Sequence, residues 1–142
     1  MTAATRILAI DFGTVRMGIA ISDPTRILAS PLAVVQNGPN TLDELAALIA
    51  KNDVAEIMIG LPLNVDGTDS NMTKRVRAFA KHVEEKFKLP VVLYDERYSS
   101  MIAQEQMIEA GRSRKQRHVK GEVDKRAAAA MLQEYLNNLP GS

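Results

Sequence analysis

The first 36 residues contain three short apolar runs, and this is the feature that most constrains the fold. Residues 6–12 and 16–22 are rich in Ile, Leu and Ala, which predicts two strands joined by a hairpin at Gly13–Val15. A third run, ILASPLAVV at 27–35, contains Pro31, which favours an edge strand or a break. An antiparallel meander of three strands is therefore expected at the start of the chain.

The pattern then changes to an alternation of amphipathic and buried stretches. Helices are expected at 41–52, 72–88 and 122–138 and from Ser99 or Ser100 to Ala110, and strands are expected at 54–62 and 89–95. The order β-β-β-α-β-α-β-α-α predicts an α/β fold with a mixed sheet, three strands antiparallel and two parallel, and helices on its faces. We expect one domain over residues 1–142.

Composition excludes several kinds of chemistry. The chain has no cysteine and two histidines, so disulfides, thiolate zinc sites, cysteine nucleophiles and histidine-rich metal sites are not expected. No apolar run is long enough to span a membrane, and we expect a cytoplasmic protein without a membrane partner.

Charge is unevenly distributed although the formal net charge is only +1. The stretch AGRSRKQRHVKG, which precedes Glu122, has no acid and five cations: Arg112, Arg114, Lys115, Arg117 and Lys120. A local field of this kind attracts phosphates even when the whole protein is nearly neutral. The alternative is a solvated loop.

Acidic residues stand at the ends of predicted elements. Asp11 ends the first strand, Asp95 and Glu96 end the last strand, and Asp124 lies early in the last helix. Each acid alone suits a turn or a helix start. If the first and last strands are neighbours, their carboxyl ends bring the acids together, and clustered carboxylates need a cation, for which oxygen ligands select Mg²⁺ or Mn²⁺. Periodicity leaves open whether Asp95 or Glu96 takes part, because the preceding VVLY is apolar on both faces.

Four motifs in this order, DFGTVRMGIAISD, GLPLNVDGT, DERYSS and KGEVDKRAAAAMLQEYL, resemble those of the YqgF/RuvX family. The resemblance covers nearly the whole chain and implies an RNase H-like fold. It implies that Asp11, Glu96 and Asp124 are catalytic residues and metal ligands. It also implies that Arg16, Arg97 and Lys120 contact the nucleic-acid backbone. Ser100 stands where the family usually has threonine, so the hydroxyl is kept.

The family is described as nucleases of precursor 16S ribosomal RNA or as Holliday junction resolvases. The resemblance therefore implies Mg²⁺- or Mn²⁺-dependent phosphodiester hydrolysis that processes the 5′ end of pre-16S rRNA in ribosome biogenesis, leaving a 3′-hydroxyl and a 5′-phosphate. The expected partners are structured RNA and the ribosomal small-subunit precursor, and we expect a monomer or a weak homodimer.

Three other functions remain as alternatives. One is a resolvase acting on a four-way DNA junction, which would require a dimer with two sites. Another is an RNA-binding module without catalysis, in which the basic stretch would do the binding. The third is phosphotransfer, because DFGT is similar to a phosphate-binding motif of actin-like ATPases and sugar kinases. Those proteins close two lobes over a nucleotide, and a chain of 142 residues is short for two lobes.

Overall fold

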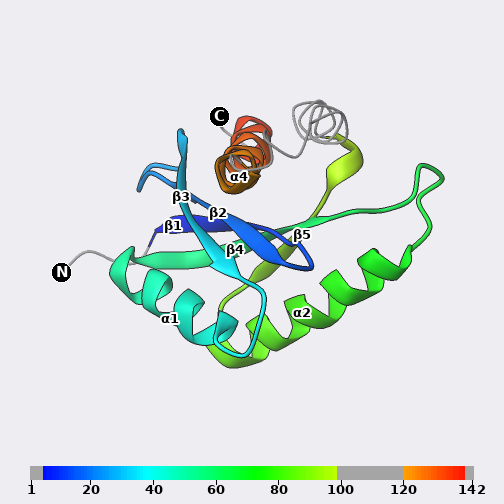
Figure 1. Ribbon diagram of the computed structural model, residues 1–142. Coiled ribbons are helices and arrows are strands. Elements are labelled where there is room, and N and C mark those ends of the chain that lie inside the picture. The colour runs from blue at the N-terminus through cyan, green and yellow to red at the C-terminus, as the bar shows by residue number, and fades with distance from the viewer. Residues whose placement is uncertain (1–4, 99–119, 140–142) are drawn as a thin grey trace.

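The computed structural model describes residues 5–98 and 120–139 and contains a five-stranded mixed sheet with helices on both faces (Figure 1). The strands are β1 (Arg6–Asp11), β2 (Arg16–Ser22), β3 (Ala29–Gln36), β4 (Val54–Leu61) and β5 (Val91–Asp95). The helices are α1 (Thr41–Lys51), α2 (Asn71–Phe87) and α4 (Lys120–Asn137), and a 3₁₀ turn, η1 (Glu96–Tyr98), follows β5.

The strand order is β3-β2-β1-β4-β5. β1, β2 and β3 pair antiparallel, whereas β4 pairs parallel with both β1 and β5. The predicted mixed sheet of three antiparallel and two parallel strands is therefore confirmed. β3 lies at the edge, as its proline predicts, since Pro31 cannot donate a ladder hydrogen bond.

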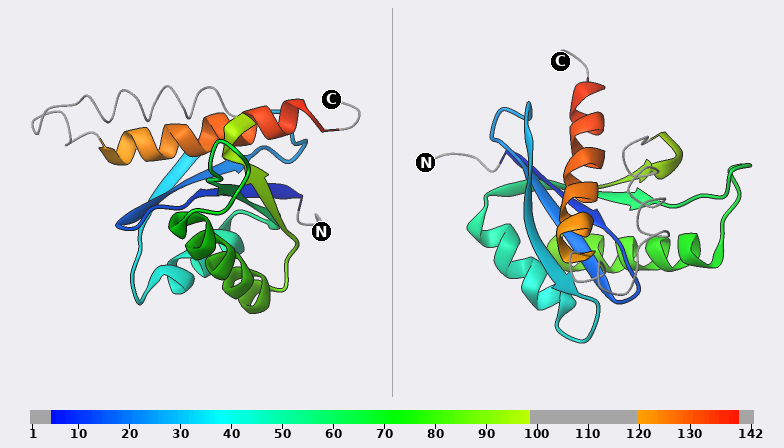
Figure 2. Two further views of the ribbon diagram at one scale, coloured as in Figure 1. Left: turned by 90° about the vertical axis from the view of Figure 1, so that its right-hand side faces the viewer. Right: turned by 45° about the horizontal axis from the view of Figure 1, so that its top comes forward.

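Two apolar cores lie on opposite faces of the sheet. Figure 2 shows the helices that cover these faces, α1 and α2 on one side and α4 on the other. Leu8, Ile10 and Ile59 belong to the core beneath α1 and α2, whereas Ile7, Ala9 and Met58 belong to the core beneath α4. Successive strand residues point to opposite faces, so β1 and β4 are apolar throughout because both faces are covered. In α4 the small side chains of Ala127 and Ala128 lie buried against the sheet.

The predicted helices at 41–52, 72–88 and 122–138 are present with ends shifted by one or two residues. Such shifts are usual for helix termini. The helix expected from Ser99 or Ser100 to Ala110 and most of the basic stretch lie outside the described residues.

α2 begins with a reciprocal cap. The Ser70 hydroxyl accepts a hydrogen bond from the Thr73 N–H at 3.1 Å, and the Thr73 hydroxyl accepts one from the Ser70 N–H at 3.0 Å. The Thr73 hydroxyl also donates to the Pro62 carbonyl at 2.5 Å. Since Thr73 is fully buried, it ties the start of α2 to the end of β4.

Thr73→Val should lower the free energy of unfolding by about 1–3 kcal/mol, because the isosteric side chain leaves the partly buried Pro62 carbonyl and Ser70 N–H without their partner. Urea unfolding followed by circular dichroism measures this loss. Thr68→Val, which removes an exposed hydroxyl from the same segment, is the matched control and should cost clearly less. Equal losses for the two variants would contradict the anchoring role of Thr73.

Candidate active site

The carboxyl ends of β1, β4 and β5 meet at one edge of the sheet because these three strands are parallel. Asp11 is the last residue of β1, and Asp95 is the last residue of β5. Arg16 begins β2 at the same edge, just beyond the hairpin. Open α/β sheets bind ligands at this kind of edge.

Gly13 lets the β1–β2 hairpin close. A Cβ atom at this position would collide with the Arg16 carbonyl oxygen, so only glycine allows the chain to approach itself so closely. Asn37 holds the hairpin from the end of β3, since its side-chain amide donates to the Gly13 carbonyl at 2.9 Å. The backbone between Asp11 and Arg16 is thereby fixed beside the strand ends.

Strand alternation assigns the acids to different faces. Asp11 follows Ile7 and Ala9 on the face beneath α4, whereas Asp95 follows Leu93 on the opposite face. The chain turns at η1 immediately after Asp95, and the carboxyl group of Glu96 hydrogen-bonds to that of Asp11. The structure therefore brings Asp11 and Glu96 together.

Glu96 is largely buried. Burial raises the pKa of the Glu96 carboxyl, its hydrogen bond to Asp11 lowers this pKa, and the charge of Asp95 raises it. Two carboxyl groups in contact can be held by a shared proton or by a cation between them, because two bare carboxylates would repel each other. The donor set of this pair, oxygen atoms alone, fits Mg²⁺ or Mn²⁺.

Gly60 of β4 provides the space that the Glu96 carboxyl group occupies. A Cβ atom at Gly60 would lie 2.5 Å from Glu96 Oε1 and 2.6 Å from Met131 Sδ, both well inside van der Waals contact. Gly60 pairs in register with Tyr94, so it lies between the ends of β1 and β5. Sequence reasoning missed this residue, because GLP was interpreted as the end of a buried strand.

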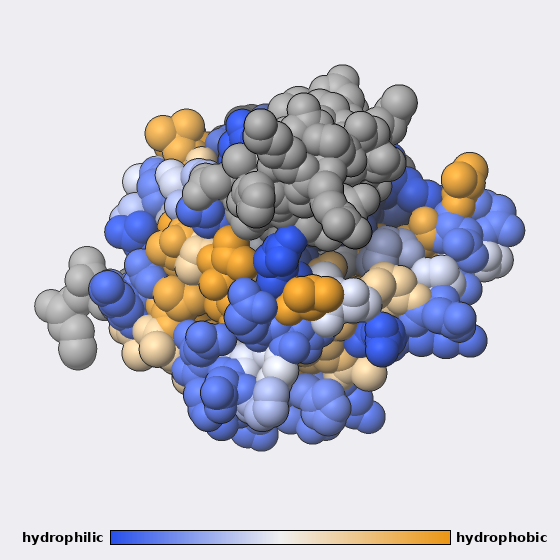
Figure 3. Space-filling model, in the orientation of Figure 1, coloured by the Kyte–Doolittle hydropathy of each residue, from blue (hydrophilic) through white to orange (hydrophobic). Residues whose placement is uncertain are grey.

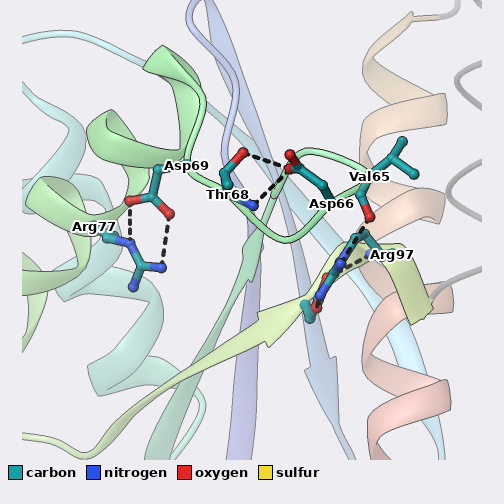
Figure 4. Close-up of polar contacts among 7 residues, drawn as sticks. Val65, Asp66, Thr68, Asp69, Arg77 and Arg97 are labelled. Carbon is teal, nitrogen blue, oxygen red and sulfur yellow. Dashed lines mark hydrogen bonds and ion pairs between the residues drawn. The ribbon is translucent and has the colours of Figure 1, made fainter.

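Arg97 joins the end of β5 to the segment between β4 and α2 (Figure 4). Its Nε and Nη2 atoms donate to Asp95 Oδ2 at 3.0 and 2.6 Å, and Nη1 donates to the Val65 carbonyl at 3.1 Å. The hydrogen bonds from Arg97 lower the pKa of the Asp95 carboxyl. The Asp95 carboxylate is thus held in an ion pair with Arg97.

The Asp66 carboxylate also accepts hydrogen bonds within its own segment. Its Oδ1 accepts hydrogen bonds from the Thr68 hydroxyl at 2.6 Å and from the Thr68 N–H at 3.1 Å, which orders the exposed turn before α2. These bonds lower the pKa of the Asp66 carboxyl. Neither Asp66 nor Asp95 contacts the Asp11–Glu96 pair through any of these bonds.

Asp124 and Lys120 belong to α4, which covers the face that carries Asp11 and Glu96, but their side chains lie outside the described part of the structure. Among the described residues, no three His, Cys, Asp or Glu side chains are grouped so as to hold a metal ion. The metal-ligand roles of Asp11, Glu96 and Asp124 all stay predictions.

The protein has an RNase H-like fold, as predicted. Two solved structures of fowlpox virus Holliday junction resolvase match it with a TM-score of 0.51. One is 15% identical, and the match covers 94% of this chain and 99% of the resolvase chain. The other, in complex with substrate junction DNA, is 12% identical, and the match covers 95% of this chain and 99% of the resolvase chain. Likeness at this identity shows the fold alone.

The chain belongs to the RuvX family, which is described as Holliday junction resolvase and matches residues 5–138. Similar proteins of Maridesulfovibrio salexigens and Koribacter versatilis are both named "Putative pre-16S rRNA nuclease". The first is 41% identical over 133 residues, with 92% of this chain and 97% of the relative covered. The second is 42% identical over 134 residues, with 92% and 86% covered. Within the described residues, no helix is long and apolar enough to cross a membrane.

Gly60→Ala should displace the Glu96 carboxylate from Asp11 and lower the free energy of unfolding by about 1–3 kcal/mol, because the added methyl group overlaps Glu96 and Met131. A crystal structure of the variant shows the displacement, and urea unfolding gives the energetic cost. Ala20→Val, which overpacks the same core on β2, is the control for simple strain and should leave Glu96 in place. An undisturbed Glu96 in the Gly60→Ala variant would contradict this account.

Proposed function

We propose that this protein is a metal-dependent nuclease that hydrolyses phosphodiester bonds in nucleic acid, with the precursor of 16S ribosomal RNA as its substrate. The observation that carries the proposal is the contact between Asp11 and Glu96 at the carboxyl edge of the sheet, with Glu96 largely buried. The names of the relatives from Maridesulfovibrio salexigens and Koribacter versatilis support the choice of substrate.

Asp11, Glu96 and Asp124 would hold a divalent cation, Mg²⁺ or Mn²⁺. Asp124 stands seven residues before Met131 in α4, and residues seven apart lie near the same side of a helix. Met131 is the α4 residue whose sulfur borders Gly60 beside Glu96. This position on α4 supports Asp124 as the third ligand.

When bound, the cation lowers the pKa of the attacking water and polarises the phosphodiester. The chain's own residues do the rest of the work. Asp11 and Glu96 would orient the reacting groups from the ends of β1 and β5, which lie on either side of β4. Arg16 would contact the substrate phosphates from the start of β2, at the same edge. Lys120 would do so from the first residue of α4.

Arg97 has a more specific place in this proposal. Its guanidinium already joins Asp95 to the Val65 carbonyl, so we propose that it acts first as a support for the segment before α2. A nucleic-acid contact by Arg97, as the family resemblance implies, would use the same exposed residue. We further propose that the protein works in the cytoplasm on the ribosomal small-subunit precursor, as a monomer or weak homodimer.

A resolvase acting on four-way DNA junctions is the second candidate, favoured by the description of the matching family. Resolution of a junction needs two cuts and therefore two sites in a dimer. A native mass measurement that shows only a monomer would count against it, whereas paired, symmetric cuts in a four-way junction would favour it over RNA processing.

Asp11→Asn and Glu96→Gln should each lower cleavage on the order of 100-fold or more, since even residues that only support metal ligands cost 10–100-fold when changed. Asp124→Asn should behave in the same way. The assay compares a precursor 16S rRNA fragment carrying its 5′ leader with a four-way DNA junction, in Mg²⁺ and in EDTA. Nucleic-acid binding should persist in these variants.

Asp95→Asn is the matched control, because it makes the same carboxylate-to-amide change at the neighbouring residue that faces away from Asp11. It should retain most of the cleavage activity. Loss of activity in Asp95→Asn with full activity in Glu96→Gln would show that Asp95, and not Glu96, is the catalytic acid. Absence of Mg²⁺-dependent cleavage of both substrates by the unmodified protein would overturn the nuclease proposal and leave a binding module.

A further inference from the structure

The first two thirds of α2 form a strongly basic surface. Between Asn71 and His82 the helix has no acidic residue and four exposed cations: Lys74, Arg75, Arg77 and Lys81. The following turn has a net negative charge, with Glu84 and Glu85 beside Lys86. The excess of positive charge is therefore confined to the part of α2 that begins at the carboxyl edge of the sheet.

Helix stability does not account for these cations. The start of a helix carries a partial positive charge, so acidic side chains are favoured there and cationic ones are not. α2 has no acid in its first turn, and its start is satisfied by the Ser70–Thr73 cap instead. Lys74 and Arg75 follow directly, at positions where the partial positive charge of the helix start repels their own positive charge.

The basic residues project away from the core. Val76, Ala80 and Val83 are buried against the sheet, whereas Lys74, Arg75 and Lys81 are exposed on the other side of the helix. Arg77 is engaged by Asp69, whose carboxylate accepts from Nε at 2.9 Å and from Nη2 at 3.1 Å (Figure 4). We call the surface formed by Lys74, Arg75 and Lys81 the basic face of α2. The part of the surface where α2 lies is mostly hydrophilic in Figure 3.

The basic face is attached firmly to the edge that carries Asp11 and Glu96. Thr73 anchors the start of α2 to the Pro62 carbonyl, and Arg97 fixes the intervening segment through Val65 to the end of β5. A long polyanion held at the strand ends could therefore extend along α2 without any rearrangement of the segment between them.

We propose that the basic face of α2 is a docking surface for the sugar–phosphate backbone of a double-helical RNA stem that adjoins the cleaved segment; this inference rests on the proposed nuclease function. Charge complementarity selects the occupant, because three exposed cations on one helix, with no acidic residue among them, attract the phosphates of a nucleic-acid backbone. A lipid surface fits less well. The large apolar side chains exposed among the described residues are Val15, Ile27, Leu28 and Val65, none of them on α2.

The test is the triple variant Lys74→Glu, Arg75→Glu and Lys81→Glu. The control is the triple variant Lys51→Glu, Lys86→Glu and Lys88→Glu, which makes the same change in net charge at exposed residues elsewhere. Both are made in the complete chain, and circular dichroism and urea unfolding establish that they fold. Binding to an RNA stem with a single-stranded 5′ extension is measured without Mg²⁺ over a range of KCl concentrations, and cleavage of the same RNA is measured with Mg²⁺.

Reversal on the basic face should weaken binding by about 10–100-fold near 0.1 M KCl and reduce the slope of log K against log[KCl] by about 2–3, as expected for the loss of three phosphate contacts. The cleavage rate at saturating RNA should stay close to that of the unmodified protein, because these residues lie away from Asp11 and Glu96. The control triple should keep both the affinity and the salt slope nearly unchanged.

Equal weakening in the two triple variants would overturn the inference, since it would reflect net charge rather than this surface. Unchanged RNA affinity in the variant with the reversed basic face would also overturn it. The same holds if that variant has a lower cleavage rate at saturating RNA but no loss of affinity. Binding of the unmodified protein to anionic phospholipid vesicles, but not to RNA, would assign the face to a membrane surface and overturn it. Failure of the nuclease proposal is distinguishable, because it appears as a lack of cleavage by the unmodified protein.

Discussion

The parallel pairing of β4 with both β1 and β5 is the interaction on which the candidate site depends. It brings the carboxyl ends of three strands to one edge, although β5 ends far along the chain from β1. Asp11, Gly60 and Glu96 then form a row across neighbouring strands. Each of the three alone is an ordinary residue at a strand end, and the candidate site arises only from their adjacency. A change of one residue in the register of β4 would present a different side chain to Glu96.

Strand alternation gives the two consecutive acids at the end of β5 different environments. Asp95 points toward the α2 side and is neutralised by Arg97, so its charge supports the exposed segment before α2. Glu96 turns toward α4, where burial disfavours a lone charge and Asp11 is the neighbour. A buried carboxylate that is close to another one is costly unless a proton or a cation compensates it. The same local sequence thus supplies one structural acid and one acid suited to chemistry.

Much of the fold could be predicted from the sequence because buried strands and amphipathic helices leave local patterns, and Pro31 marked the edge strand. The choice between Asp95 and Glu96 could not, since VVLY is apolar on both faces and the 3₁₀ turn after it has no clear signature. The role of Gly60 depends on Met131 and Glu96, which are distant in sequence. The bonds of Arg97 likewise depend on Val65, from another segment, so no local pattern could indicate them.

A nuclease of this design must hold a polyanion beside its own carboxylates, and these repel phosphates. Cations placed directly against Asp11 and Glu96 would form ion pairs with them and compete with a catalytic metal ion. In this fold the sheet separates the two sets of charges, with the acids beneath α4 and the basic face on the outward side of α2. Under the proposed function, the acids would attract a cation on one side of the sheet, and α2 would attract the backbone of the substrate on the other.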